Sequence, residues 1–176
     1  SFLMVARFSE AFLSLYAKEF GCPHSILPLI IIIMDLFHAS LAAYSGRLTQ
    51  FYSSKKILLF GLFLLVFNNF WFYKAENLTD IFIGISLVGI HMGLTQGIIR
   101  SILAQNIPES LRGSCFALFY LVSGVCILFG NILAGSLSDT FGLRYIFLSG
   151  AMFSFSSAIV FSLLIKKKKK IPSMKV

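Results

Sequence analysis

The chain has 176 residues, of which 57% are hydrophobic and only 12% charged, with a formal net charge of +8 and a mean hydropathy of +0.87. Soluble domains average about 25% charged residues, so this composition excludes a globular protein that covers its surface in water. It indicates an integral membrane protein. The basic excess does not indicate a nucleic-acid partner, because much of it forms one run, Lys166–Lys170, directly after an apolar segment. Lysines there set topology and contact anionic lipid headgroups.

Six apolar segments are long enough to cross a bilayer, for which a helix needs about 20 residues. They lie at approximately 1–17, 26–45, 57–73, 81–104, 114–137 and 145–165. Turn and charge signals separate them, at Gly21–Pro23, Arg47–Lys56, Lys74–Asn77, Pro108–Arg112 and Ser138–Arg144. We therefore predict an all-α fold with one six-helix transmembrane domain over residues 1–165 and a basic cytoplasmic tail at 166–176. The chain starts with Ser1 rather than Met, so we expect the natural start to be missing.

The distribution of Lys and Arg predicts the orientation in the lipid bilayer. With the C-terminus inside, the inner segments hold most of the basic residues: Arg47, Lys55, Lys56, Arg112 and the lysines of the tail. The outer loops hold Lys18, Lys74 and Arg144. This asymmetry matches the positive-inside rule for a multi-pass protein of the cell (inner or plasma) membrane with both termini cytoplasmic.

A short internal repeat relates the two halves of the chain. Gly46–Gln50 follows the second segment and Gly135–Asp139 follows the fifth, and both read Gly-x-Leu-(Ser/Thr)-(Asp/Gln). The repeating unit is then three spans, at about 1–80 and 81–165. Because three is odd, the second copy is inverted in the membrane, an arrangement typical of secondary transporters.

The second segment carries Asp35 and His38 in an otherwise apolar run. Their i, i+3 spacing places them on one helical face. A charge at the centre of a membrane helix costs about 2.5–3.5 kcal/mol on insertion scales, so it needs a partner or a path to water. A carboxylate beside an imidazole can pass a proton, and we expect Asp35 to carry proton coupling with His38 tuning it. The alternative is a hydrogen-bonded pair that orders the bundle.

The first segment contains a second pair with the same spacing, Arg7 and Glu10. Residues three apart on a helix can form an ion pair, which lowers the free-energy cost of burying both charges. We place the pair in the substrate or ion pathway. The alternatives are a purely structural ion pair or a gate latch.

The fourth segment combines small and polar residues on one helical stripe. Gly89, Gly93 and Gly97 recur every four residues, so another backbone or a ligand can approach closely. Gln96 and Arg100 fall on the same stripe. We expect Arg100 to face protein or a water-filled cavity. The alternative is that the glycines only pack a neighbouring helix and that Arg100 snorkels to the surface.

Three further polar residues lie within spans. Asn68 and Asn69 of the third segment can hydrogen-bond to neighbouring helices, and this segment and the sixth are otherwise Phe-rich and predicted to face lipid. His91 points away from the glycine stripe and is interpreted as a packing residue.

Sequence signatures of catalysis and of metal or cofactor binding are absent. The chain has no HExxH, GxSxG or P-loop pattern, and its three cysteines show no CxxC spacing. We therefore expect no enzymatic activity, no metal and no cofactor.

The stretch after the second segment resembles the cytoplasmic loop motif of the major facilitator superfamily, Gly-x-Leu-(Ala/Ser)-Asp-Arg-x-Gly-Arg-(Arg/Lys)-(Arg/Lys). Gly46, Leu48, Lys55 and Lys56 match it. The chain departs from the motif at Gln50, Phe51, Ser53 and Ser54, which stand where the motif has Asp, Arg, Gly and Arg. These departures imply a weakened charge latch at this loop.

Other stretches extend the resemblance over essentially the whole chain. Pro108–Gly113 resembles the loop that enters the eleventh helix of a full facilitator transporter. Arg7–Leu13 and Gly89–Gly97 look like a bacterial subgroup of uncharacterised facilitator proteins.

The resemblance implies the C-terminal six-helix half of a twelve-helix transporter. In such proteins the first and fourth helices of each half line one shared cavity, and the third and sixth lie outside. The implied function is secondary active transport of small-molecule substrates by alternating access, which we expect to be coupled to protons. The partner is then a missing N-terminal six-helix half or a second copy. The alternative is a non-transporting membrane remnant or an assembly subunit.

Overall fold

Helices account for nearly all of the structure, a computed structural model that describes residues 10–168, with side chains through Leu163. They are α2 (Glu10–Glu19), α3 (Leu27–Phe51), α4 (Ser54–Lys74), α5 (Leu78–Gln105), α6 (Arg112–Phe141) and α7 (Leu143–Lys168), with a short 3-10 turn, η1 (Glu109–Leu111), before α6. Within the described residues, five segments are long and apolar enough to cross a membrane: α3, α4, α5, η1 with α6, and α7. Of the first predicted span, residues 1–9 lie outside the described part.

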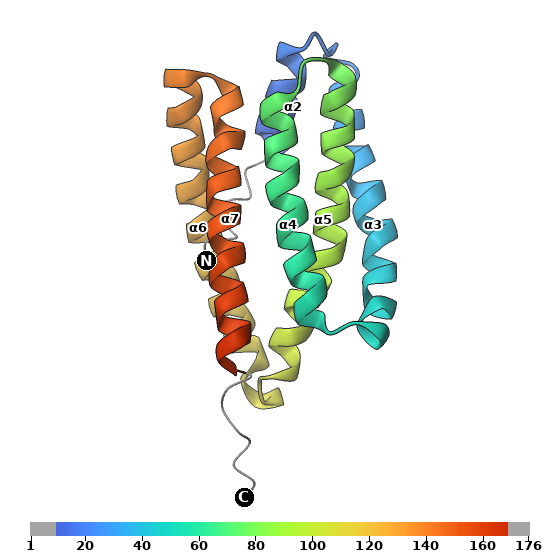
Figure 1. Cartoon of the computed structure of the whole chain (residues 1–176), viewed down its shortest axis with the longest axis vertical. Coiled ribbons are helices and arrows are strands. Elements are labelled where there is room, and N and C mark those ends of the chain that lie inside the picture. Colours follow the sequence, from blue (N-terminus) through green and yellow to red (C-terminus); the bar gives the residue numbers. More distant parts are fainter. Residues whose placement is uncertain (1–9, 169–176) are drawn as a thin grey trace, which may run out of the picture.

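The helices run alternately up and down, so their turns gather at two ends of the bundle (Figure 1). One end carries the turns between α2 and α3, between α4 and α5, and between α6 and α7. We call it the 75–77 end after the α4–α5 turn. The opposite end carries the turns after α3 and α5, and we call it the 52–53 end.

The predicted break at Arg47–Lys56 is wrong in its extent. α3 continues to Phe51 and α4 begins at Ser54, which leaves only Tyr52 and Ser53 between the two helices. The polar residues of this stretch remain helical because their exposed side chains reach water while the backbone keeps its helical hydrogen bonds. Charge therefore marks where the apolar span stops rather than where the helix stops.

The break between α6 and α7 is also shorter than the predicted Ser138–Arg144, because the polar residues there again remain helical. α6 continues to Phe141, and Gly142 alone separates it from α7. Gly142 has φ of 97°, a left-handed conformation that glycine adopts without steric penalty and that reverses the chain in one residue.

Two clusters of buried apolar side chains hold the bundle together. The larger one centres on Tyr16, Ile30, Phe72, Ile85 and Phe147, which come from five different helices. Tyr16 also donates a hydrogen bond of 2.9 Å from its hydroxyl to the Phe72 carbonyl, which joins α2 to the last turn of α4. A smaller cluster of Ile57, Leu94 and Ile98 packs α4 against α5 nearer the 52–53 end.

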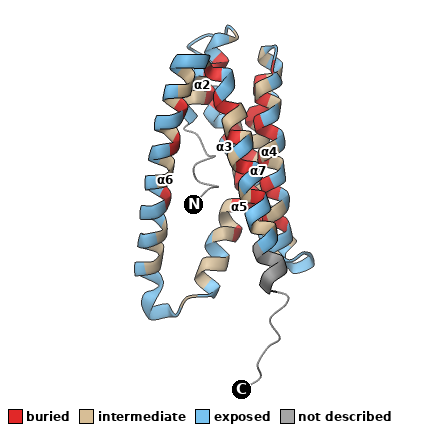
Figure 2. Cartoon of the chain, turned by 60° about the vertical axis from the view of Figure 1, so that its left-hand side comes forward, coloured by how far each residue is buried: buried red, intermediate tan, exposed pale blue. Residues whose placement is uncertain are grey.

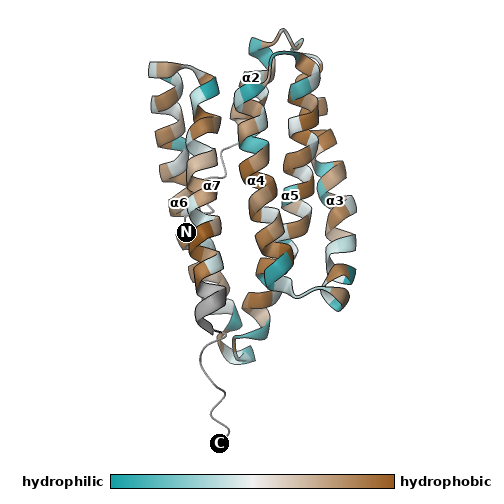
Figure 3. Ribbon diagram, viewed as in Figure 1, coloured by the Kyte–Doolittle hydropathy of each residue, from teal (hydrophilic) through white to brown (hydrophobic). Residues whose placement is uncertain are grey.

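Burial is uneven among the long helices (Figure 2). In the most apolar window of α5, 56% of the residues are buried, but in those of α3 and α6 the share is only 11%. The exposed residues on α3 and α6 are nevertheless apolar along most of each helix (Figure 3). Surfaces of this kind need lipid or another protein against them.

The two repeated pentapeptides lie at opposite ends of the bundle. Gly46–Gln50 belongs to the last turns of α3, at the 52–53 end, and Gly135–Asp139 to the last turns of α6, at the 75–77 end. This is the placement that inverted copies require. The division into repeats at 1–80 and 81–165 stays a prediction.

Candidate functional site

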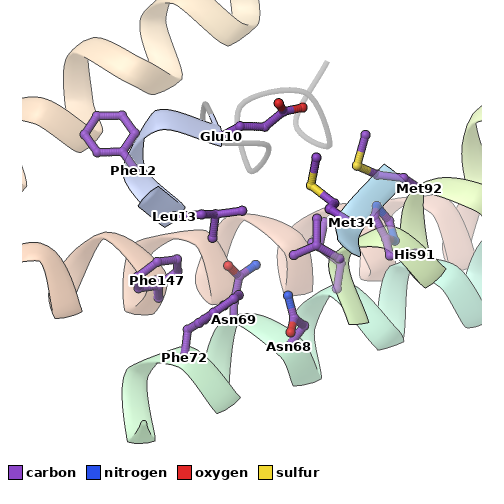
Figure 4. Close-up of a pocket in the computed structure, with 12 residues that line it drawn as sticks. Glu10, Phe12, Leu13, Met34, Asn68, Asn69, Phe72, His91, Met92 and Phe147 are labelled. Carbon is purple, nitrogen blue, oxygen red and sulfur yellow. The ribbon is translucent and has the colours of Figure 1, made fainter. Parts of the chain in front are cut away.

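A cavity of about 60 Å³ lies inside the bundle, among α2, α3, α4, α5 and α7. One water molecule needs about 10–15 Å³ of such space, so the cavity has room for more than one. Its lining mixes apolar and polar side chains: Glu10, Phe12, Leu13, Met34, Leu65, Asn68, Asn69, Phe72, Val88, His91, Met92 and Phe147. Figure 4 shows the two asparagines on α4 and Glu10 on the far side of the cavity, on α2.

The adjacent asparagines of α4 have different hydrogen-bonding environments. Asn69 donates from Nδ2 to Ser154 Oγ of α7 at 3.3 Å, and Ser154 in turn donates to the Gly150 carbonyl at 2.7 Å. Asn68 is 1% exposed, and its Oδ1 has no hydrogen-bond partner in the described part of the chain. A buried acceptor without a partner costs about 1–3 kcal/mol. Asn68 Oδ1 can therefore accept a hydrogen bond from water or from a polar ligand in the cavity.

His91 connects α5 to α4 beside the cavity. Its Nδ1 lies 2.7 Å from the Gly61 carbonyl, and because a carbonyl can only accept, Nδ1 carries the hydrogen. In the neutral ring, Nε2 then carries no hydrogen. The close approach depends on Gly61, since a side chain at that position would collide with the methyl group of Thr95.

Glu10 is the acidic residue among the twelve that line the cavity. It is exposed and begins α2. Its predicted partner Arg7 lies outside the described residues, so the Arg7–Glu10 ion pair stays a prediction.

The structure does not bring Asp35 and His38 into this cavity. Asp35 is exposed on α3 and forms no ion pair within the described part of the chain. His38 is half-buried, and its carbonyl lies against Gly93 of α5. The pair therefore sits on the sparsely covered side of α3, outside the core.

The glycine stripe of α5 faces α3. A Cβ at Gly93 would lie 2.6 Å from Leu41 Cβ and 2.7 Å from the His38 carbonyl oxygen. A Cβ at Gly89 would collide with the Met34 carbonyl oxygen, whereas one at Gly97 would meet Ser45 Oγ at 3.7 Å, an ordinary contact. The two helices thus approach most closely around the first two glycines.

Gln96 and Arg100 lie at the edge of this stripe and do not line the cavity. Gln96 is half-buried and Arg100 is exposed, and Arg100 Nε donates to the Gln96 carbonyl of the same helix at 3.3 Å. Within this chain, then, Arg100 faces outward from the bundle.

The residues that match the facilitator motif lie on helices at the 52–53 end. Gly46 and Leu48 belong to α3, and Lys55 and Lys56 belong to the first turn of α4. Leu48 packs against the smaller core cluster, and the two lysines are exposed.

Sequence reasoning did not predict this cavity or its methionines, Met34 and Met92. A signal was present in Asn68 and Asn69, two amides in the middle of a Phe-rich span.

A family model for the Major Facilitator Superfamily matches residues 2–175. The chain belongs to the Major Facilitator Superfamily. The predicted all-α fold, a six-helix facilitator half, is confirmed by this match and by solved structures. A peptide transporter POT mutant in complex with alafosfalin superposes with a TM-score of 0.75 at 16% identity, covering 99% of this chain and 40% of that one. The same transporter in complex with sulfate gives 0.69 at 16% identity, with 99% and 39% covered.

Two curated relatives are similar in sequence. The "Uncharacterized MFS-type transporter MJ1560" of Methanocaldococcus jannaschii is 21% identical over 157 residues, which are 89% of this chain and 40% of the relative. The "Sugar transport protein MST7" of Oryza sativa subsp. japonica is 28% identical over 134 residues, which are 71% and 26%. The chain thus spans two fifths or less of the curated relatives it matches.

Proposed function

We propose that this facilitator chain is the C-terminal six-helix half of a secondary active transporter of small solutes, which works by alternating access and is coupled to protons. The observation that carries the proposal is the superposition of nearly the whole chain on two fifths of a solved peptide transporter. The relatives are described as an MFS-type transporter and a sugar transport protein. These names support a small-molecule substrate.

The exposed apolar faces of α3 and α6 support a second six-helix unit as partner. These are the second helices of the two proposed repeats, and both are about equally uncovered within the chain. Either a missing N-terminal half or a second copy can cover them. The shared cavity between the halves then forms against the helices of this chain that are first and fourth in order, α2 and α5.

In this arrangement the site residues have distinct roles. Glu10 of α2 and its predicted partner Arg7 contact the solute or the proton, and Asn68 and His91 form the polar wall behind them. Asp35 accepts the coupled proton on the α3 surface that meets the other half. His38 lies one turn further along α3 and tunes Asp35.

Gln96 and Arg100 extend the solute path along α5 toward the 52–53 end. Both termini and the α3–α4 turn are cytoplasmic in this proposal. The lysines at the start of α4 and in the tail then follow the positive-inside rule.

The test uses this chain joined to the six spans expected upstream, reconstituted in vesicles with an imposed pH gradient. We expect accumulation of a small solute from a panel of sugars and peptides. Asp35→Asn should abolish accumulation but leave solute exchange, because exchange needs no net proton movement. Asp139→Asn, an exposed acid near the end of α6, is the matched control.

Accumulation by the Asp35→Asn protein at the parent rate would show that Asp35 does not couple protons. Absence of both accumulation and exchange in the parent protein, for every solute tested, would favour the non-transporting assembly subunit.

A further inference from the structure

A groove of about 270 Å³ lies between α4 and α7 on the outside of the bundle, separate from the polar cavity. It is lined by Phe63 of α4 and by Phe155, Ala158, Ile159, Ser162 and Leu163 of α7. Phe63, Phe155 and Leu163 are each at least half exposed. The groove therefore opens outward, on the two helices that the sequence predicts to face lipid.

The register between α4 and α7 shows what lies at the end of this groove. The Ala75 carbonyl accepts a hydrogen bond from Arg144, Phe72 stacks on Phe147, and Asn69 donates a hydrogen bond to Ser154. The two helices are therefore antiparallel, and each step toward the start of α4 is matched by a step toward the end of α7. Continued past Phe63, the same register places the first turn of α4 level with the last turns of α7.

Both of these helix ends are basic. The first turn of α4 carries Lys55 and Lys56, which are exposed, and α7 ends in the run that begins at Lys166 and continues in the helix to Lys168. Lys166 follows the groove residue Leu163 by three positions, a rise of about 4.5 Å along the helix. The groove is thus apolar along its length and cationic at the 52–53 end.

We propose that this groove is a binding site for an anionic phospholipid. One acyl chain lies against Phe63, Phe155 and Ile159, and the headgroup phosphate meets Lys55 and Lys56 at the 52–53 end. A basic cluster beside a membrane helix attracts anionic lipid by about 1 kcal/mol per lysine. The groove gives the acyl chain one fixed position. Elsewhere on the membrane-facing surface an acyl chain has no preferred position, because lipid tails are as apolar as the side chains that they contact.

The length of the groove favours a lipid over a partner helix. Residues 155–163 cover about 12 Å of α7, less than half the roughly 30 Å apolar thickness that a packed membrane helix contacts. The inference depends on the membrane location of the chain and not on its transport activity, so its failure leaves the proposed function untouched.

The test measures lipid retained by the purified chain in mild detergent by native mass spectrometry. The probes are phosphatidylglycerol and phosphatidylcholine with identical acyl chains, added in equal amounts. We expect phosphatidylglycerol to be retained preferentially. The double change Lys55→Gln plus Lys56→Gln should lower that preference about tenfold or more, since 1 kcal/mol is about fivefold in affinity. Lys74→Gln, at the opposite end of α4, should change it less than twofold.

A second arm tests the groove itself. Ser162→Phe fills the groove and should lower retention of both lipids severalfold, whereas Ser156→Phe, on the exposed side of α7, should not. If Ser162→Phe prevents folding, Phe155→Ala removes one wall from an exposed position and should also lower retention. Equal retention of the two lipids, or unchanged retention in both groove variants, would overturn the proposal. Displacement of the lipid by an equal concentration of soluble glycerol phosphate would also overturn it, because charge alone would then account for binding.

Discussion

The close contact between α3 and α5 gives a sharp prediction at Gly93. In Gly93→Ala the added methyl group lies 2.6 Å from Leu41 Cβ and 2.7 Å from the His38 carbonyl oxygen. An ordinary contact begins at 3.4 Å, so the neighbouring groups must retreat by about 0.8 Å. One obstacle is backbone and the other is the first carbon of a side chain, so neither can move aside without moving α3.

The magnitude follows from two opposing effects. Overpacking of this kind lowers the free energy of unfolding by about 1–3 kcal/mol. Alanine regains about 0.5–1 kcal/mol because it loses less backbone entropy in a helix than glycine does. The net destabilisation is then at most about 2.5 kcal/mol, which corresponds to a fall of up to about 10 °C in unfolding temperature for a chain of this size.

Matched glycines on the same scaffold isolate the effect. Gly97→Ala meets only Ser45 Oγ at 3.7 Å, and Gly124→Ala on α6 meets nothing within 4 Å. Both should leave the unfolding temperature unchanged or raise it. The assay is thermal unfolding in detergent, followed with a thiol-reactive dye in a background that carries Cys115→Ser and Cys126→Ser, so that the dye reports the exposure of the buried Cys22. A rise for Gly93→Ala equal to that for Gly124→Ala would refute the close helix contact.

Three further predictions concern other parts of the bundle. Asn68→Leu should raise the unfolding temperature, because it removes a buried acceptor without a partner, which costs about 1–3 kcal/mol. Asn69→Leu should lower the unfolding temperature, because it breaks the hydrogen bond to Ser154. Shifts of the same sign in the two variants would contradict this difference. Tyr16→Phe should lose about 1 kcal/mol of stability with its hydrogen bond to Phe72, while Tyr44→Phe, which is 60% exposed, should lose none. Single cysteines at Ser53 and Glu76, both exposed, should react with an impermeant thiol reagent from opposite faces of the membrane, Ser53 from the cytoplasmic face; labelling of both from one face would disprove the topology.

The spans could be predicted from sequence because burial in a bilayer requires long apolar runs whatever the neighbours are. Helix ends could not, since Gly46–Phe51 is polar enough to resemble a loop and yet stays helical. The four-residue spacing was enough to predict that Gly93 lies on a helical face open to close packing. It could not predict that α3 is the helix packed there, because that depends on the tertiary structure.

The candidate site was harder to predict because its composition also depends on which helices lie next to one another. Asp35 and His38 share a face, but periodicity within α3 does not reveal that this face lies away from the cavity. The difference between Asn68 and Asn69 depends on where Ser154 falls, and Ser154 lies on a helix 85 residues further along the chain.

We propose that this facilitator half supplies only one wall of a transport path. The most direct measurement is solute uptake in vesicles that contain, on average, less than one copy of the 176-residue chain, compared with vesicles that contain the chain joined to a second six-helix half. We predict uptake above background only for the joined protein. Equal uptake per copy by the single chain would show that one six-helix half forms the whole path.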